Sequence, residues 1–225
     1  MNLSFKNDPT IKESLIQRMD KHIELDELVQ KATGQDGKGC TVWCALNNGD
    51  LKAGYNHEAF ESVLGLPEWL ARLHDTIYEG LEVKDSKWFS KEWVRAVPVG
   101  VNLDIIKWKF CAFILKENIE RVLLLDIKEK LKKQIVDAIK QCLDVQEKAI
   151  ETGNWDGSAA RSAARSATRS AARSAWSAWS AESAAWCAAR SAAESAAWSA
   201  AESAAYKRYA NELLRLFREQ QNTTI

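Results

Sequence analysis

Apolar residues recur at helical spacing along residues 9–150, in segments separated by glycine, proline and short polar turns. A helix places positions i, i+3, i+4 and i+7 on one face, and the apolar side chains of residues 67–81 follow this spacing. No segment alternates apolar and polar residues as a half-buried strand would. The pattern predicts helices over residues 9–34, 40–46, 57–64, 67–81, 85–97, 103–114 and 119–150, the last as one helix or a pair.

Helix-end signals support several of these boundaries. Asp8 precedes Pro9, which is the arrangement of an N-cap followed by proline in the first helical turn. Gly65 follows one predicted helix and Pro67 begins the next. The sequence Pro-Val-Gly at 98–100 ends a further helix.

The segment from Ser158 to Tyr206 repeats a short unit of serine, alanine and one larger residue. Because a helix turns about 100° per residue, a four-residue unit moves the large residue about 40° forward and a three-residue unit moves it about 60° back. Three consecutive short units end at Trp176, Trp179 and Glu182. They keep the large residues on one half of the helix, which favours a single two-faced helix over random low complexity.

The predicted repeat helix spans residues 158–225 and contains neither glycine nor proline. Residues 174–182, where the short units cluster, are its expected point of distortion. One face is smooth with alanine and serine, and the other carries bulk and charge, so either could cover a neighbouring surface. The expected interaction face consists of Arg161, Arg165, Arg169, Arg173, Trp176, Trp179, Trp186 and Trp198.

These patterns together predict an all-α fold. A helical globular domain is expected over residues 1–152, and the long alanine-rich helix over 158–225. The glycine-flanked segment 153–157 is the expected hinge between them.

Composition narrows the classes of function. Lysine plus arginine and aspartate plus glutamate number 31 each, so no overall charge attracts polyanions. Five cysteines in a chain with a polar N-terminus are expected to be reduced thiols of a cytoplasmic protein. Apolar runs are too short to cross a bilayer, so no membrane partner is expected. Nucleic acid is an unfavoured partner, although the stripe from Arg161 to Arg173 could follow phosphates.

Cys40 and Cys44 are the first candidates for a metal or redox site. They lie four residues apart and would share one face of a helix, and His57 and His74 could complete a ligand set. No second pair of cysteines with the spacing of a zinc site follows. Two small buried core residues are therefore the competing interpretation.

A small-ligand site is the second hypothesis for the same region. Backbone N–H groups of residues 37–39, before a helix start, could hold an anion, with Lys38 supplying charge. Asp75 and Glu79 are neighbours on one helix, so their carboxylates could share a cation. An ordinary turn and a solvated acidic face are the competing interpretations. The candidate ligand-binding residues are Lys38, Gly39, Cys40, Asp75 and Glu79.

Several motifs carry a resemblance to a known group of proteins. They are GKGCTVWC at 37–44, LGLPEWL at 64–70, DTIYEGL at 75–81, PVGVNL at 98–103, and the serine–alanine repeat with tryptophan or arginine. Together they resemble an uncharacterised family of bacterial and bacteriophage proteins that joins such a block to an alanine-rich repeat. The resemblance implies a prokaryotic or phage cytoplasmic setting and implies no catalytic residues.

The sequence therefore favours a non-enzymatic helical protein that acts by binding. The repeat helix would serve packing or self-association, with another protein or a second copy of the chain as partner. The alternative is a domain centred on residues 37–81 that binds a small ligand or a metal, with enzymatic activity left open. Nucleic-acid binding is the second alternative. No cofactor is predicted.

Overall fold

The computed structural model describes residues 3–47, 56–158, 162 and 187–223. The regular elements within these ranges are helices, which confirms the predicted all-α fold. Two isolated β-bridges join Leu28 and Thr33 to Gly39 without forming a sheet.

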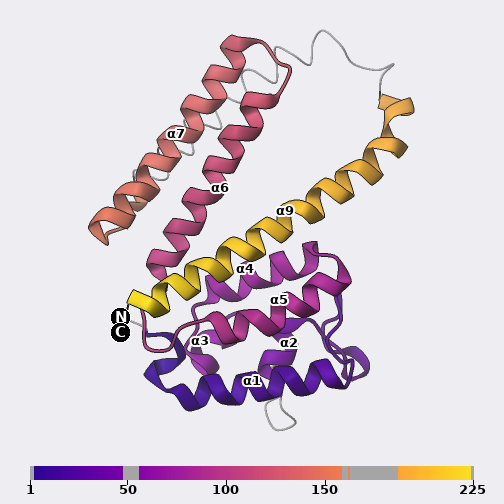
Figure 1. Ribbon diagram of the computed structural model, residues 1–225, viewed down its shortest axis with the longest axis vertical. Coiled ribbons are helices and arrows are strands. Elements are labelled where there is room, and N and C mark those ends of the chain that lie inside the picture. Colours follow the sequence, from indigo (N-terminus) through magenta and orange to yellow (C-terminus); the bar gives the residue numbers. More distant parts are fainter. Residues whose placement is uncertain (1–2, 48–55, 159–161, 163–186, 224–225) are drawn as a thin grey trace. The chain divides into compact units, whose positions relative to one another are not determined.

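Contacts divide the chain into two compact units. The first joins Met1–Leu103 to Trp198–Ile225, and the second consists of Asp104–Ala197. The C-terminal part of the predicted repeat helix thus belongs to the same unit as the N-terminal helices (Figure 1). The elements are the 3-10 helices η1 (Ser4–Asn7) and η2 (Gln35–Gly37) and the α-helices α1 (Pro9–Glu24), α2 (Thr41–Leu46), α3 (Ala59–Leu64), α4 (Glu68–Gly80), α5 (Val83–Ala96), α6 (Asp104–Leu124), α7 (Glu129–Thr152) and α9 (Cys187–Thr223).

The predicted helix-end signals in the first unit are confirmed. The Asp8 side chain accepts a hydrogen bond from the Thr10 N–H, and Pro9 begins α1. Gly65 ends α3 in the left-handed conformation, with φ of 68°. Pro67 immediately precedes α4.

Three predicted boundaries are wrong. α1 ends at Glu24 rather than Gly34, because Asp26 and Lys31 adopt left-handed conformations and Val29 N–H donates to Gly39 O. α5 begins at Val83, before the predicted cap at residue 85. α6 runs on to Leu124, past its predicted end at residue 114, so the segment 119–150 is divided between α6 and α7, in line with the predicted alternative of a pair.

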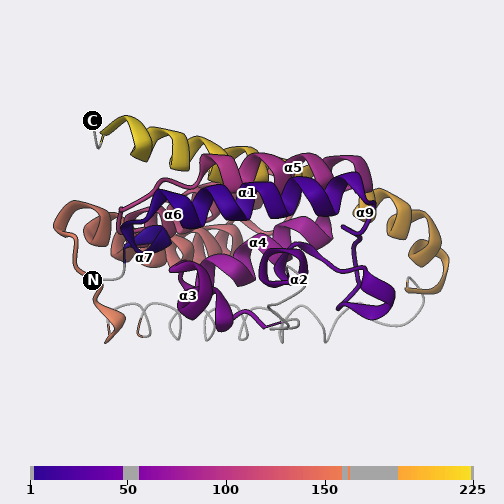
Figure 2. The same cartoon turned by 90° about the horizontal axis from the view of Figure 1, so that it is seen from below.

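The core of the first unit lies between α1, α2, α4 and α5. α1 packs against both α2 and α5 (Figure 2). The Arg95 guanidinium on α5 donates to both carboxylate oxygens of Asp20 on α1, at 2.9 and 2.6 Å. Fully buried side chains that fill the core include Leu15, Met19, Leu46, Leu70, Phe89 and Trp93.

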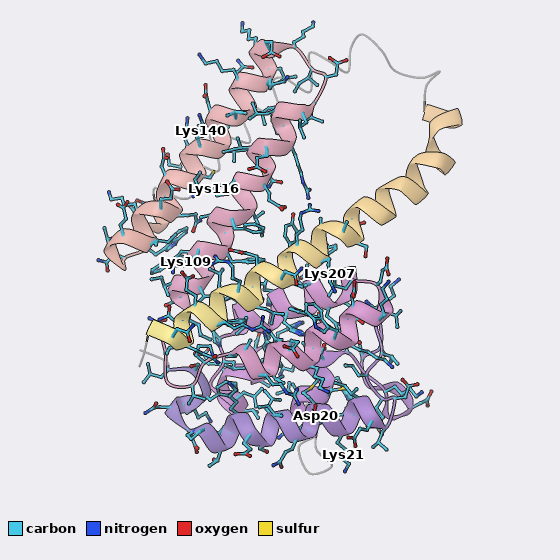
Figure 3. All side chains as sticks on the ribbon, viewed as in Figure 1. Asp20, Lys21, Lys109, Lys116, Lys140 and Lys207 are labelled. Carbon is cyan, nitrogen blue, oxygen red and sulfur yellow. The ribbon has the colours of Figure 1, made fainter. Side chains whose placement is uncertain are left out.

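The C-terminal part of α9 packs on α5. Lys207 makes a 2.6 Å ion pair with Asp85, and its ammonium lies 3.9 Å from the centre of the Trp88 ring (Figure 3). Arg218 pairs with Glu92 at 2.9 Å. The apolar side chains that α9 buries are Ala205, Ala210, Leu213, Leu214, Leu216 and Phe217.

The second unit contains the antiparallel hairpin of α6 and α7 (Figure 1). Lys116 on α6 pairs with Glu147 on α7 at 2.8 Å (Figure 3). In the part of the chain that the structure describes, no helix combines the length and the apolar character that crossing a bilayer requires.

Gly80 allows the ring of Tyr206 on α9 to lie directly against α4. A Cβ at this position would overlap the ring, including its Cγ. Overpacking costs about 1–3 kcal/mol, whereas alanine gains at most about 1 kcal/mol over glycine in a helix and less at its last residue. We expect Gly80→Ala to lower the free energy of unfolding by about 1–2 kcal/mol, measured by urea denaturation.

The control for this substitution is a double-mutant cycle with Tyr206→Ala. In that background the clash is gone, so Gly80→Ala should be neutral or slightly stabilising. An equal loss with and without the tyrosine ring would show that the contact is not the cause.

Candidate metal centre

One thiol and two carboxylates meet between α2 and α4. Cys40 immediately precedes α2, and Asp75 and Glu79 lie one turn apart on α4. The Cys40 Sγ and one carboxylate oxygen of each acid all lie within 4.8 Å of one another. Cys40 is 1% exposed, and both acids are partly buried. Two elements far apart in sequence therefore bring three groups of metal-ligand type together.

Backbone hydrogen bonds fix the position of Cys40. The N–H of Gly39 donates to Glu27 O at 2.9 Å, and the N–H of Cys40 donates to Ala32 O at 2.8 Å. Gly39 is required here because a Cβ would come within 2.6 Å of the Trp43 side chain. The loop that follows α1 is thereby joined to the start of α2.

The same hydrogen bonds engage one amide of the predicted anion site. The amides of Gly39 and Cys40 donate to backbone carbonyls. Lys38 is exposed, and after Lys87 its charge contributes to lowering the pKa of Asp26. Anion binding at residues 37–39 stays a prediction.

Glu79 is oriented by the backbone of the loop after α1. The N–H of Lys31 donates to its two carboxylate oxygens at 3.1 and 2.9 Å. The Gln30 side chain donates to the carbonyls of Tyr78 and Leu81 at 2.7 and 2.8 Å. These bonds hold the end of α4 against the loop, so the Glu79 carboxylate keeps one position beside Asp75.

A histidine adjoins the cluster through Asp75. His57 Nε2 lies 3.3 Å from Asp75 Oδ2, and the two side chains are 12% and 14% exposed. Cys44, one turn after Cys40, is buried, and its thiol donates weakly to Gly39 O at 3.6 Å. The candidate residues Cys40, Asp75 and Glu79 thus form the group, with His57 next to it.

Burial and like charge keep protons on the cluster in the absence of a cation. Burial, assisted by the neighbouring Asp75, raises the pKa of the Cys40 thiol to about 12. Burial and the nearby Cys40 and Glu27 raise the pKa of Cys44 as well. Burial raises the pKa of Glu79, with a smaller contribution from Asp75. A bound cation would reverse these shifts by stabilising the charged forms.

His74 lies in an aromatic environment and not in the cluster. Its ring stacks on Phe89 with centroids 4.8 Å apart and meets Trp93 at 4.5 Å. Burial lowers the pKa of His74 to about 3, so the ring is neutral near pH 7. Its Nε2 is buried and has no hydrogen-bond partner among the described residues.

An open cavity of about 560 Å³ adjoins Glu79. Its walls come from the loop after α1, the end of α4 and α9. The sequence patterns missed this cavity, since Gln30 and Lys31 fell inside a predicted helix and Tyr206 belonged to the repeat. Its polar and aromatic walls include Gln30, Lys31, Glu79, Glu82, Glu202 and Tyr206.

The predicted interaction face of the repeat lies outside the described residues. This applies to the side chains of Arg161, Arg165, Arg169, Arg173, Trp176, Trp179, Trp186 and Trp198, and to the expected distortion at 174–182. A protein partner, self-association and nucleic-acid binding through this face stay predictions.

Comparison of the chain with protein-family models, with curated proteins and with solved structures finds no match. The geometry of the cluster is therefore the guide to function. The resemblance to bacterial and bacteriophage proteins stays a prediction.

Burial of neutral His74 predicts loss of stability in acid. The unfolded imidazole takes up a proton below its ordinary pKa of 6.5, whereas the folded one resists protonation down to about pH 3. Stability contributed by His74 is therefore present at neutral pH and lost as the pH falls through this window, by at most about 1.4 kcal/mol per pH unit.

The variant His74→Phe keeps an aromatic ring and removes the titration. We expect its free energy of unfolding, from urea denaturation between about pH 6 and pH 4, to fall less steeply than that of the wild type. Parallel slopes in the two proteins would contradict the assignment.

Proposed function

We propose that this protein binds a divalent transition-metal ion of the zinc class, with Cys40, Asp75 and Glu79 as its ligands. The observation that carries the proposal is that their sulfur and oxygen atoms lie within 4.8 Å of one another. Zinc binds sulfur at about 2.3 Å and carboxylate oxygen at about 2.0–2.2 Å, so small side-chain movements would let these atoms converge on a single ion.

The donor set favours zinc over magnesium or calcium. Magnesium and calcium bind oxygen ligands, whereas a thiolate is a soft ligand that selects zinc and its neighbours. Three protein ligands leave a further position on a tetrahedral ion for water or another ligand. Of the three proposed ligands, Glu79 also lines the cavity of about 560 Å³.

His57 supports the site from beside Asp75. Imidazoles and carboxylates commonly pair around bound metals, where the pairing orients the ligand. With its Nε2 3.3 Å from Asp75 Oδ2, His57 would hold the Asp75 carboxylate or replace one of its contacts to the ion. In the first role its Nε2–H donates a hydrogen bond to Asp75. In the second role its Nε2 binds the ion through a lone pair.

Removing a ligand should weaken metal binding without unfolding the chain. We expect Cys40→Ser, Asp75→Asn and Glu79→Gln each to lower zinc affinity by more than about tenfold, because even outer-shell partners contribute 10–100-fold. The measurement is isothermal titration of chelator-treated full-length protein with zinc, alongside circular dichroism as a test of folding.

Matched controls separate the site from other thiols and acids. Cys111→Ser changes a thiol in the second unit, and Glu82→Gln changes a 59% exposed carboxylate near Glu79. Both should bind zinc as the wild type does. The proposal fails if the wild type binds no zinc, or if Cys111→Ser weakens binding as much as Cys40→Ser.

Zinc affinity should rise with pH. The Cys40 thiol keeps its proton when metal-free, with a pKa of about 12, and must release it to become a thiolate ligand. Because one proton leaves for each ion bound, affinity should increase about tenfold per pH unit between roughly pH 6.5 and 7.5. Titrations in buffers of different ionisation enthalpy measure the released proton. In Cys40→Ser this proton release should be absent.

A further inference from the structure

Three consecutive leucines are exposed where α6 ends. Leu123, Leu124 and Leu125 are 54%, 86% and 49% exposed, and we call these residues the leucine tip. They lie at the turn between the two helices of the α6–α7 hairpin (Figure 1). Adjacent exposed leucines differ from scattered apolar residues on a surface, because together they form a continuous apolar patch that favours contact with an apolar phase.

Basic residues surround the leucine tip. Residues 121–133 contain five basic residues and two acidic ones, a net charge of +3 in a chain whose net charge is zero. Two of the basic residues are already paired, Lys132 with Glu129 at 3.0 Å and Arg121 with Glu117 at 3.6 Å. The exposed lysines closest to the tip in sequence are Lys128, Lys130 and Lys133.

The positive charge of these lysines indicates which kind of partner could cover the leucine tip. A second copy would bring another set of lysines against the first, and like charges repel across such a contact. A surface that is negatively charged outside and apolar beneath matches both the lysines and the leucines.

We propose that the leucine tip docks onto an anionic phospholipid surface. The leucine side chains enter the boundary between headgroups and acyl chains, and the three lysines contact the headgroup phosphates, as amphipathic interfacial segments do. This is peripheral contact and requires no spanning helix. It departs from the expectation that no membrane partner is involved, which rested on the shortness of the apolar runs.

Vesicle co-sedimentation of the full-length chain tests the proposal. We expect binding to vesicles of phosphatidylcholine with phosphatidylserine, and little binding to phosphatidylcholine alone. The triple variant Lys128→Gln/Lys130→Gln/Lys133→Gln should bind about 100-fold more weakly, since each lysine contributes about fivefold at an anionic surface. The triple variant Leu123→Ser/Leu124→Ser/Leu125→Ser should lose at least about tenfold while keeping its charge.

The matched control places serine at apolar residues of the first unit with similar exposure. Leu25 and Val83 are 54% and 64% exposed, so Leu25→Ser/Val83→Ser should leave vesicle binding unchanged. The proposal is overturned if the wild type does not bind phosphatidylserine vesicles at low salt, or if the leucine variant binds as well as the wild type. It is also overturned if light scattering shows a dimer that the leucine variant alone dissolves, because the tip would then join two copies.

Discussion

The indole of Trp43 lies against two glycines, and the position of the candidate metal centre depends on this contact. A side chain at Gly34 or Gly39 would overlap the indole, so both residues must lack a Cβ. The His22 ring also lies near the indole, with centroids 5.5 Å apart, and its Nε2–H donates a hydrogen bond to Asn47 O at 2.9 Å. Trp43 thus fixes the loop between α1 and α2, and Cys40 takes its place facing α4 as a consequence.

Charge is balanced differently in the cluster and in the Asp20–Arg95 ion pair that joins α1 to α5. Arg95 meets both oxygens of Asp20, so that pair is electrically satisfied within the protein. At the cluster, the Lys31 N–H donates to Glu79, His57 lies 3.3 Å from Asp75, and the Cys40 thiol keeps its proton. Partial burial of two acids beside this buried thiol costs free energy, which a bound cation would offset. This imbalance is the physical reason to regard the cluster as a binding site and the ion pair as structural.

Local chemistry placed some helix ends correctly. The Asp8 cap marks the start of α1, and Gly65 marks the end of α3. The loop after α1 was missed because its apolar residues keep helical spacing, while the left-handed conformations at Asp26 and Lys31 depend on pairing with Gly39. The local sequence pattern contains no information about pairing with Gly39.

The same limit applied to the candidate site. Cys40, Asp75 and Glu79 were recognisable as ligand types, but nothing in their spacing showed that the 34 residues between Cys40 and Asp75 bring α4 back to α2. His57 and His74 looked equivalent in sequence. Their environments differ because His74 faces the aromatic core between Phe89 and Trp93, whereas His57 meets a carboxylate.

The first unit is interrupted in sequence, since Asp104–Ala197 is inserted between its two parts. During synthesis, the surface of α5 that α9 covers stays uncovered until Leu213, Leu214 and Phe217 have left the ribosome. Once they dock, the inserted residues form a closed loop, and the entropy of closing such a loop grows only with the logarithm of its length. Gain or loss of serine–alanine units during evolution would therefore leave the stability of the anchored ends nearly unchanged, which frees the repeat to vary in number.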